Sequence, residues 1–247
     1  ERRCVMKPIH ARLASTALFL LAASPWLACS EKQTVVVNPT NQDRARAIDE
    51  LNDATAVVHE MAATKEIPLD RRQEARCVIV VPGMKSGAFV VGGASGHGVS
   101  TCRTARAWSA PAFVKLGGAS FGAQIGGQSA DLLMLVNSGE AMNKLFTSSF
   151  QLGAGMSVAA GPVGGGEQAA ANVKKADVLT YARTKGLFAG VDVSGIWVKH
   201  DAAALSGLYG AANADIQRIL DGATPVPKEA VPFVEQVALV FPASPER

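Results

Sequence analysis

The stretch CVIVVPGMKSGAFVVGGASGHGVSTCRT, residues 77–104, decides the fold class. Three runs within it, CVIVVPG, GAFVVGG and GVSTCRT, are rich in β-branched residues and are interrupted by glycine. That pattern is typical of strands joined by tight turns. We therefore predict three strands in this stretch.

The glycine-rich pattern continues along the chain. Residues 112–137 (AFVKLGGASFGAQIGGQSADLLMLVN) predict further strands, with glycine at bulges or close approaches. Residues 152–166 predict strand and turn, and residues 177–200 (DVLTYARTKGLFAGVDVSGIWVKH) predict two strands or one long, bent strand.

Helical patterns flank these strands. Apolar residues recur at helical spacing from residue 43 to about residue 65, and residues 68–76 predict a further short helix. Ser138 is placed to cap a short helix, and the segments 201–210, 213–222 and 229–240 predict the last three. The fold class expected is α+β: a glycine-rich antiparallel β-sheet core, sandwich- or barrel-like, with amphipathic helices at the N- and C-terminal ends.

The N-terminal region has the pattern of an export signal. Residues 1–28 predict a signal peptide, in which residues 1–5 are an upstream extension before Met6. The sequence WLAC ending at Cys29 resembles a lipobox, which predicts lipidation of that cysteine, although simple secretion stays open. We expect residues 29–42 to be the lipidated N-terminus and a tether, and residues 43–245 to be a single domain.

Charge argues against nucleic acid as a partner. The chain carries 24 basic and 21 acidic residues, and residues 1–28 hold four of the basic ones against one acid. The remainder is therefore neutral, with 20 of each sign. No CxxC motif or Cys/His cluster indicates a metal or another cofactor. Cys77 and Cys102 either pair as a disulfide or are two buried free thiols.

Known catalytic patterns are absent from the sequence. No serine lies in a G-x-S-x-G motif, and the glycine-rich segments 92–98 and 161–168 match no phosphate-binding loop. We interpret His97 as a hairpin-turn residue. An enzyme would need His97 or His200 to meet a serine or a carboxylate in a pocket. We predict that the protein is not an enzyme.

Charge is nevertheless segregated along the chain. Residues 75–130 contain no acid but five cations, whereas residues 43–70 carry seven acids and three bases. In the stretch YARTKGLFAG, residues 181–190, Tyr181, Arg183 and Lys185 alternate and would share one strand face. That face is either a solvated sheet surface or a site for an anionic ligand.

Several long blocks in the same order resemble the SYLF domain family. They are residues 77–93, residues 109–131 (SAPAFVKLGGASFGAQIGGQSAD), residues 161–166 (GPVGGG) and residues 181–195 (YARTKGLFAGVDVSG). The likeness covers residues 43–245. It implies a non-catalytic module that binds phospholipid, with phosphoinositide binding in eukaryotic relatives and actin binding in fungal ones.

Together, the signal and the resemblance predict a non-enzymatic bacterial envelope lipoprotein, exported, anchored through Cys29 and located at the outer membrane. Its domain would bind anionic phospholipid. The residues expected to make that contact are Arg183, Lys185, Arg103, Arg106, Lys115 and Trp108, the last as an interfacial aromatic with a core role as its alternative. The alternative function is an envelope scaffold that recognises a protein partner.

Overall fold

The computed structural model describes residues 40–64, 66–88, 92–120, 126–147, 149–161, 176–184, 187–190, 193–210 and 215–243. All of them belong to one compact unit, Val36–Arg247. The predicted signal peptide, Cys29 and Lys185 lie outside the described residues.

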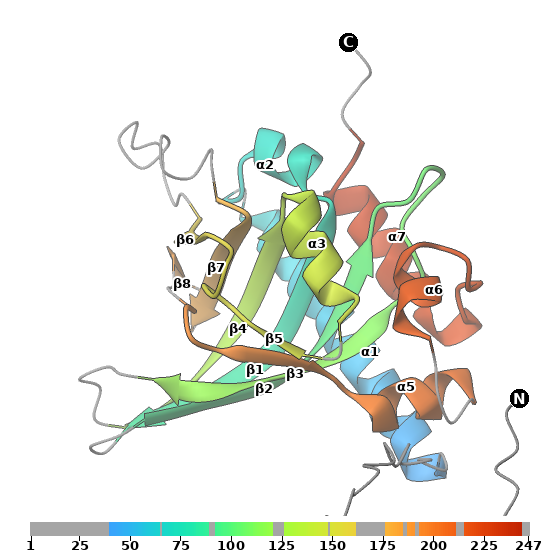
Figure 1. Cartoon of the computed structure of the whole chain (residues 1–247), viewed down its shortest axis with the longest axis horizontal. Helices are drawn as coiled ribbons and strands as arrows, with labels where there is room; N and C mark the ends of the chain where they lie inside the picture. Colours follow the sequence, from blue (N-terminus) through green and yellow to red (C-terminus); the bar gives the residue numbers. More distant parts are fainter. Residues whose placement is uncertain are drawn as a thin grey trace, which may run out of the picture. The chain divides into compact units, whose positions relative to one another are not determined.

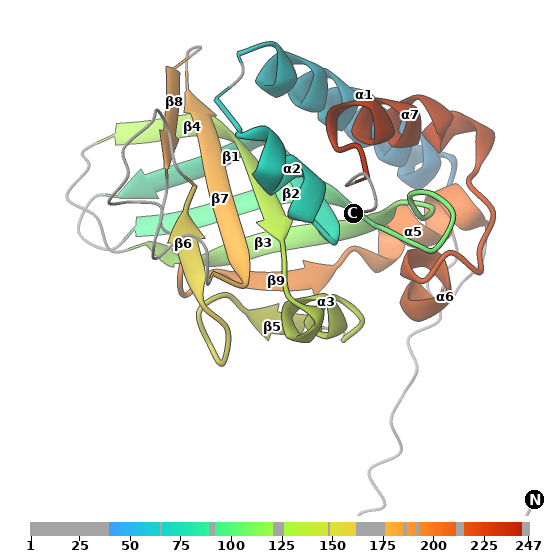
Figure 2. The same cartoon turned by 90° about the horizontal axis from the view of Figure 1, so that it is seen from above.

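A curled sheet of nine strands forms the centre of this unit (Figures 1 and 2). Its path runs β5-β9-β3-β2-β1-β4-β7-β6, and β8 pairs with β7. Every pairing is antiparallel except that of β6 with β7. The strands are β1 (Cys77–Ala88), β2 (Gly92–Cys102), β3 (Ala112–Ser120), β4 (Gly126–Val136), β5 (Ser149–Gln151), β6 (Val158–Ala160), β7 (Val178–Thr184), β8 (Leu187–Gly190) and β9 (Trp197–His200).

The stretch of residues 77–104 forms two long strands, so the expectation of three is wrong. Gly83 and Gly87 lie within β1 and do not end it. Gly83 has a φ of +54°, which suits glycine, and the pairing of β1 with β4 shifts register between Val81 and Met84. The glycine therefore marks a β-bulge. Residues 177–200 likewise form three strands, β7, β8 and β9, where one or two were expected.

The helices lie where the sequence places them. They are α1 (Asn41–Ala63), α2 (Leu69–Glu74), α3 (Gly139–Leu145), α5 (Ala202–Tyr209), α6 (Ile216–Leu220), the 3₁₀ helix η1 (Lys228–Ala230) and α7 (Val231–Val240). A capping box at Thr40 and Asp43 begins α1, and the hydroxyl of Ser138 accepts a hydrogen bond from the Ala141 N–H to begin α3. No helix in the described part of the chain has both the length and the apolar composition needed to cross a bilayer.

Both faces of the sheet are covered at its centre. Helices α1 and α7 lie side by side on one face, and α3 lies on the other (Figures 1 and 2). Consecutive residues of the central strands are therefore buried without alternation, as in 77–81, 132–136 and 178–182. The prediction of an α+β fold with a mainly antiparallel sheet and helices at both ends is confirmed.

A disulfide joins the first two strands. Cys77 and Cys102 lie directly opposite each other in the pairing of β1 with β2, and their sulfur atoms are 2.05 Å apart. Both cysteines are fully buried. Of the two alternatives left open by the sequence, the structure has the disulfide.

Candidate functional site

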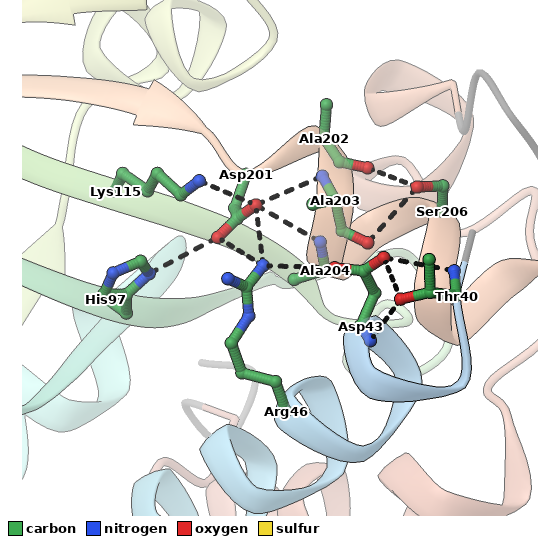
Figure 3. Close-up of polar contacts among 10 residues, drawn as sticks. All are labelled: Thr40, Asp43, Arg46, His97, Lys115, Asp201, Ala202, Ala203, Ala204 and Ser206. Carbon is green, nitrogen blue, oxygen red and sulfur yellow. Dashed lines mark hydrogen bonds and ion pairs between the residues drawn. The ribbon is translucent and has the colours of Figure 1, made fainter. Parts of the chain in front are cut away.

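A buried carboxylate gathers three basic side chains where α1, β2, β3 and α5 meet (Figure 3). Asp201 is 0% exposed. Its Oδ1 lies 3.1 Å from Lys115 Nζ, and its Oδ2 lies 3.3 Å from His97 Nδ1 and 3.4 Å from Arg46 Nη2. The basic side chains are each about half exposed, so the cluster opens toward solvent on their side.

The same carboxylate begins helix α5. Asp201 is its N-cap and accepts hydrogen bonds from the N–H groups of Ala203 and Ala204, at 3.1 and 3.2 Å. Helix α5 in turn lies directly against the first turn of α1, and this close approach requires glycine at position 207. A Cβ atom there would be 2.6 Å from the carbonyl carbon of Asp43. This close approach holds Asp201 beside Arg46 of α1.

Strand pairing supplies the other two basic groups. His97 of β2 lies directly opposite Lys115 of β3, so both side chains point to the same face of the sheet. His97 is therefore a mid-strand residue, and its interpretation as a hairpin-turn residue is wrong.

A second carboxylate, Glu50 of α1, completes the cluster. It is 8% exposed, and its Oε1 has no hydrogen-bond partner in the described structure. Burial, with the nearby charge of Asp201, raises the pKa of Glu50 to about 8. Burial also acts to raise the pKa of Asp201, but the Ala204 N–H and Lys115 outweigh it, and the pKa of Asp201 is lowered. The two neighbouring acids thus differ in charge near neutral pH.

An open groove of about 330 Å³ adjoins the cluster. It is lined by residues of β3 and β9: Lys115, Leu116, Gly117, Gly118, Trp197 and Lys199. Lys115 pairs with Lys199 and Gly117 pairs with Trp197, so all four positions share one face. Trp197 is 44% exposed, which makes it an accessible aromatic side chain beside two ammonium groups.

Arg103 and Trp108, two of the predicted lipid contacts, hold the C-terminal part of the domain. Arg103 donates hydrogen bonds to the carbonyl oxygens of Ala75, Arg72, Phe241 and Pro242. Its guanidinium lies 4.6 Å from the centre of the Trp108 ring, which packs edge-on against Phe241. Trp108 is only 5% exposed, so of its two expected roles the structure shows the core one. Arg106 is exposed in the turn between them.

Arg183, the leading predicted contact, is engaged in ion pairs. It contacts Asp131 of β4 at 2.8 Å and Glu60 of α1. These two carboxylates, led by Asp131, raise the pKa of Arg183. Three strands lie between β7 and β3, namely β2, β1 and β4. At the usual strand spacing, the distance from β7 to β3 measured along the sheet is about 19 Å. The structure therefore does not bring Arg183 together with Lys115.

Sequence reasoning missed Asp201, Glu50, Lys199 and Trp197. The alternation of WVKH, residues 197–200, places Trp197 and Lys199 on one face of a strand, but only the pairing of β9 with β3 brings them to Lys115. The other histidine considered, His200, contacts the backbone carbonyl of Leu145 through Nε2 at 2.7 Å. His97 does meet the carboxylate of Asp201, which is one of the contacts that a catalytic histidine would need.

Comparison with known proteins identifies the family. Residues 117–239, from the groove to α7, match the family described as Ysc84, "Las17-binding protein actin regulator". This chain belongs to the Ysc84 (SYLF) domain family. The resemblance found in the sequence blocks is thereby confirmed.

Relatives of the family are found in yeasts and mammals. The chain is 33% identical over 177 residues to Protein YSC84 of Saccharomyces cerevisiae, which covers 70% of this chain and 37% of that protein. It is 32% identical over 178 residues to an SH3 domain-containing protein of Schizosaccharomyces pombe (70% and 41%). It is 30% identical over 162 residues to human SH3 domain-containing YSC84-like protein 1 (64% and 47%). The chain thus spans less than half the length of these curated relatives.

Proposed function

We propose that this SYLF domain is a non-enzymatic module that binds anionic phospholipid, and that the groove between β3 and β9 receives the headgroup. The observation that carries the proposal is the exposed Trp197 beside Lys115 and Lys199. An indole at the depth of the headgroups and ammonium groups facing phosphate are the pairing that suits an anionic membrane surface.

Lys199 is the cation that is free to act in this way. It is exposed and makes no ion pair within the part of the chain that the structure describes. Lys115 is already paired with Asp201, so it contributes less unless that contact loosens. Arg183 and Arg103 are held by carboxylates and carbonyls respectively. The proposal therefore moves the predicted lipid contact from β7 to β9.

Two changes to the groove test the proposal. Reversing one charge near an anionic surface changes the binding free energy by about 2 kcal/mol, so Lys199→Glu should weaken vesicle binding about 30-fold. Burying the exposed part of Trp197, about 90 Å², stabilises the bound state by up to about 2 kcal/mol, and Trp197→Ala should remove that contribution.

The assay is co-sedimentation of the full chain with vesicles of neutral or anionic phospholipid at low and high salt. Lys228→Glu is the matched control, since Lys228 is exposed in η1 and does not line the groove. Binding that needs anionic lipid, weakens with salt and falls only in the groove variants is the expected result. Equal binding of wild type and Lys199→Glu to anionic vesicles would refute the assignment of the groove.

The envelope location belongs to the same proposal. Lipid chains on Cys29 would anchor the protein at the outer membrane, and the groove would then orient the domain on that surface or contact a second one. Comparing vesicle binding of the Cys29→Ser chain with that of the chain recovered from membranes separates the two contributions.

Protein recognition is the second candidate function, and the family description favours it. The matched family is named for binding Las17 and for regulating actin. Leu239 of α7 is 76% exposed and lies on the helix where the family match ends. If the chain binds neither neutral nor anionic vesicles, and if it binds a protein partner that the Leu239→Glu variant does not bind, the proposed function is protein recognition and not lipid binding.

A further inference from the structure

The cluster around Asp201 contains a set of donors that the groove and the lipid proposal do not use. One oxygen of Glu50, one oxygen of Asp201 and one imidazole nitrogen of His97 all lie within 4.8 Å of one another. They come from α1, the cap of α5 and β2, so the fold itself brings them together. Two carboxylates and an imidazole are the donor types that divalent transition metals accept in proteins.

The spacing is close to what an ion needs. With metal–ligand distances of about 2.1 Å, tetrahedral donors lie about 3.4 Å apart. His97 Nδ1 and Asp201 Oδ2 are already 3.3 Å apart. The three donor atoms lie within 4.8 Å of one another, so Glu50 completes the set by approaching the other two by up to about 1.4 Å, a movement that rotation of a glutamate side chain can supply.

Glu50 supplies the independent observation that points to a ligand. Asp201 is fully explained as a helix cap and as the centre of ion pairs with Arg46 and Lys115. Glu50 has no such explanation, because its Oε1 is buried without a hydrogen-bond partner among the described residues and its side chain faces the cluster. A buried carboxyl group with an unpartnered oxygen costs free energy, and a bound cation would displace its proton and supply the missing partner.

The two cations of the cluster do not block such a site. The side chains of Arg46 and Lys115 are 43% and 45% exposed, so each can turn toward solvent while its stem stays in place. His97 is 53% exposed, which leaves a path for the ion from solvent. Water would fill the fourth position of a tetrahedral ion.

We propose that Glu50, His97 and Asp201 form a binding site for one divalent transition-metal ion of the zinc type. The site lies beside the lipid groove but does not depend on it. Binding would join α1, β2 and α5 through a single ion and would replace the contacts that Arg46 and Lys115 make with Asp201.

The test is a calorimetric titration of the full chain with Zn²⁺ after treatment with a chelator. Cys4 and Cys29 are changed to serine in every sample, because their thiols would compete for zinc. Glu50→Gln and His97→Ala remove one ligand each, and His59→Ala is the matched control, an exposed histidine of α1 outside the cluster. Circular dichroism confirms that each variant is folded.

The expected result is one Zn²⁺ per chain, with affinity about 100-fold weaker or worse in Glu50→Gln and in His97→Ala and unchanged in His59→Ala. Replacing Zn²⁺ by Co²⁺ should give a visible absorption band that both ligand variants lose. The proposal is overturned if the wild type binds no Zn²⁺, or if binding survives both ligand variants. Vesicle binding by the Lys199→Glu variant is a separate readout, so failure of one proposal is distinguishable from failure of the other.

Discussion

The stability of the domain should fall as pH rises through the range in which Glu50 would ionise in the unfolded chain. Glu50 is 8% exposed, and burial raises its pKa from 4.5 to about 8. Below pH 4.5 the carboxyl is protonated in both states and contributes nothing to the difference. Between pH 4.5 and about 8 unfolding releases its proton, so each further pH unit favours the unfolded state. Above pH 8 the effect is complete.

The magnitude follows from the two pKa values. A rise from 4.5 to about 8 corresponds to at most about 5 kcal/mol of lost stability at high pH. Glu50→Gln keeps the shape of the side chain and cannot ionise. We therefore expect equal free energies of unfolding for the variant and the wild type at pH 4, and a variant that is more stable by several kcal/mol at pH 9.

The assay is urea denaturation of both proteins from pH 4 to pH 9, with a chelator present so that no metal contributes. Other groups titrate in the same range, but they are common to both proteins, so the difference between the two curves isolates Glu50. Asp49→Asn, an exposed acid of the same helix, is the control and should reproduce the wild-type curve. If Glu50→Gln loses as much stability between pH 5 and pH 9 as the wild type, the reasoning about Glu50 is wrong.

Three further predictions concern the scaffold. Replacing Cys77 and Cys102 with alanine removes a disulfide that joins positions 25 residues apart, so the free energy of unfolding measured in urea should fall by about 3.5 kcal/mol. An unchanged urea midpoint would contradict this prediction. Gly207→Ala places a Cβ atom against the backbone of α1, which should lower the free energy of unfolding by about 2 kcal/mol and Tm in a thermal melt by about 6 °C. A Tm equal to that of the wild type would show that α5 can move away from α1. Within the described part of the chain the buried hydroxyl of Tyr181 has no hydrogen-bond partner, so Tyr181→Phe should leave the free energy of unfolding unchanged or raise it by about 1 kcal/mol. A decrease of more than about 1 kcal/mol would mean that the hydroxyl is hydrogen-bonded.

The elements of this fold are predictable from local patterns, because their causes are local. Ser138 caps α3, and a run of spaced apolar residues forms α1, since capping and periodicity act within a few residues. Gly83 was misread for the same local reason. A glycine between β-branched runs fits a turn or a bulge equally well, and only the partner strand β4 decides between them.

The candidate site was not predictable, because it depends on which strands become neighbours. Strand β9 lies next to β3 although the paired residues Gly117 and Trp197 are 80 positions apart in the sequence, and no local pattern encodes that neighbourhood. Glu50 is likewise a charged residue on the buried side of α1, where Leu51 and Ala54 pack, and charge alone suggests exposure.

The predicted cations are held by different groups: Arg103 by backbone carbonyls, Lys115 by Asp201 at the cap of α5, and Arg183 by Asp131 of β4 and Glu60 of α1. At one end of α1, Arg46 contacts Asp201; toward the other end, Glu60 contacts Arg183. Of these three cations, Arg183 is the one that an acid of α1 neutralises, and it shares that role with Asp131 of the sheet. The ion pair of Glu60 with Arg183 joins α1 to β7, whereas Lys115 and Arg103, from the acid-free segment, are held by other parts of the domain. A cation available to an outside ligand must lie away from all of these partners, and Lys199 on β9, at the groove, meets that condition.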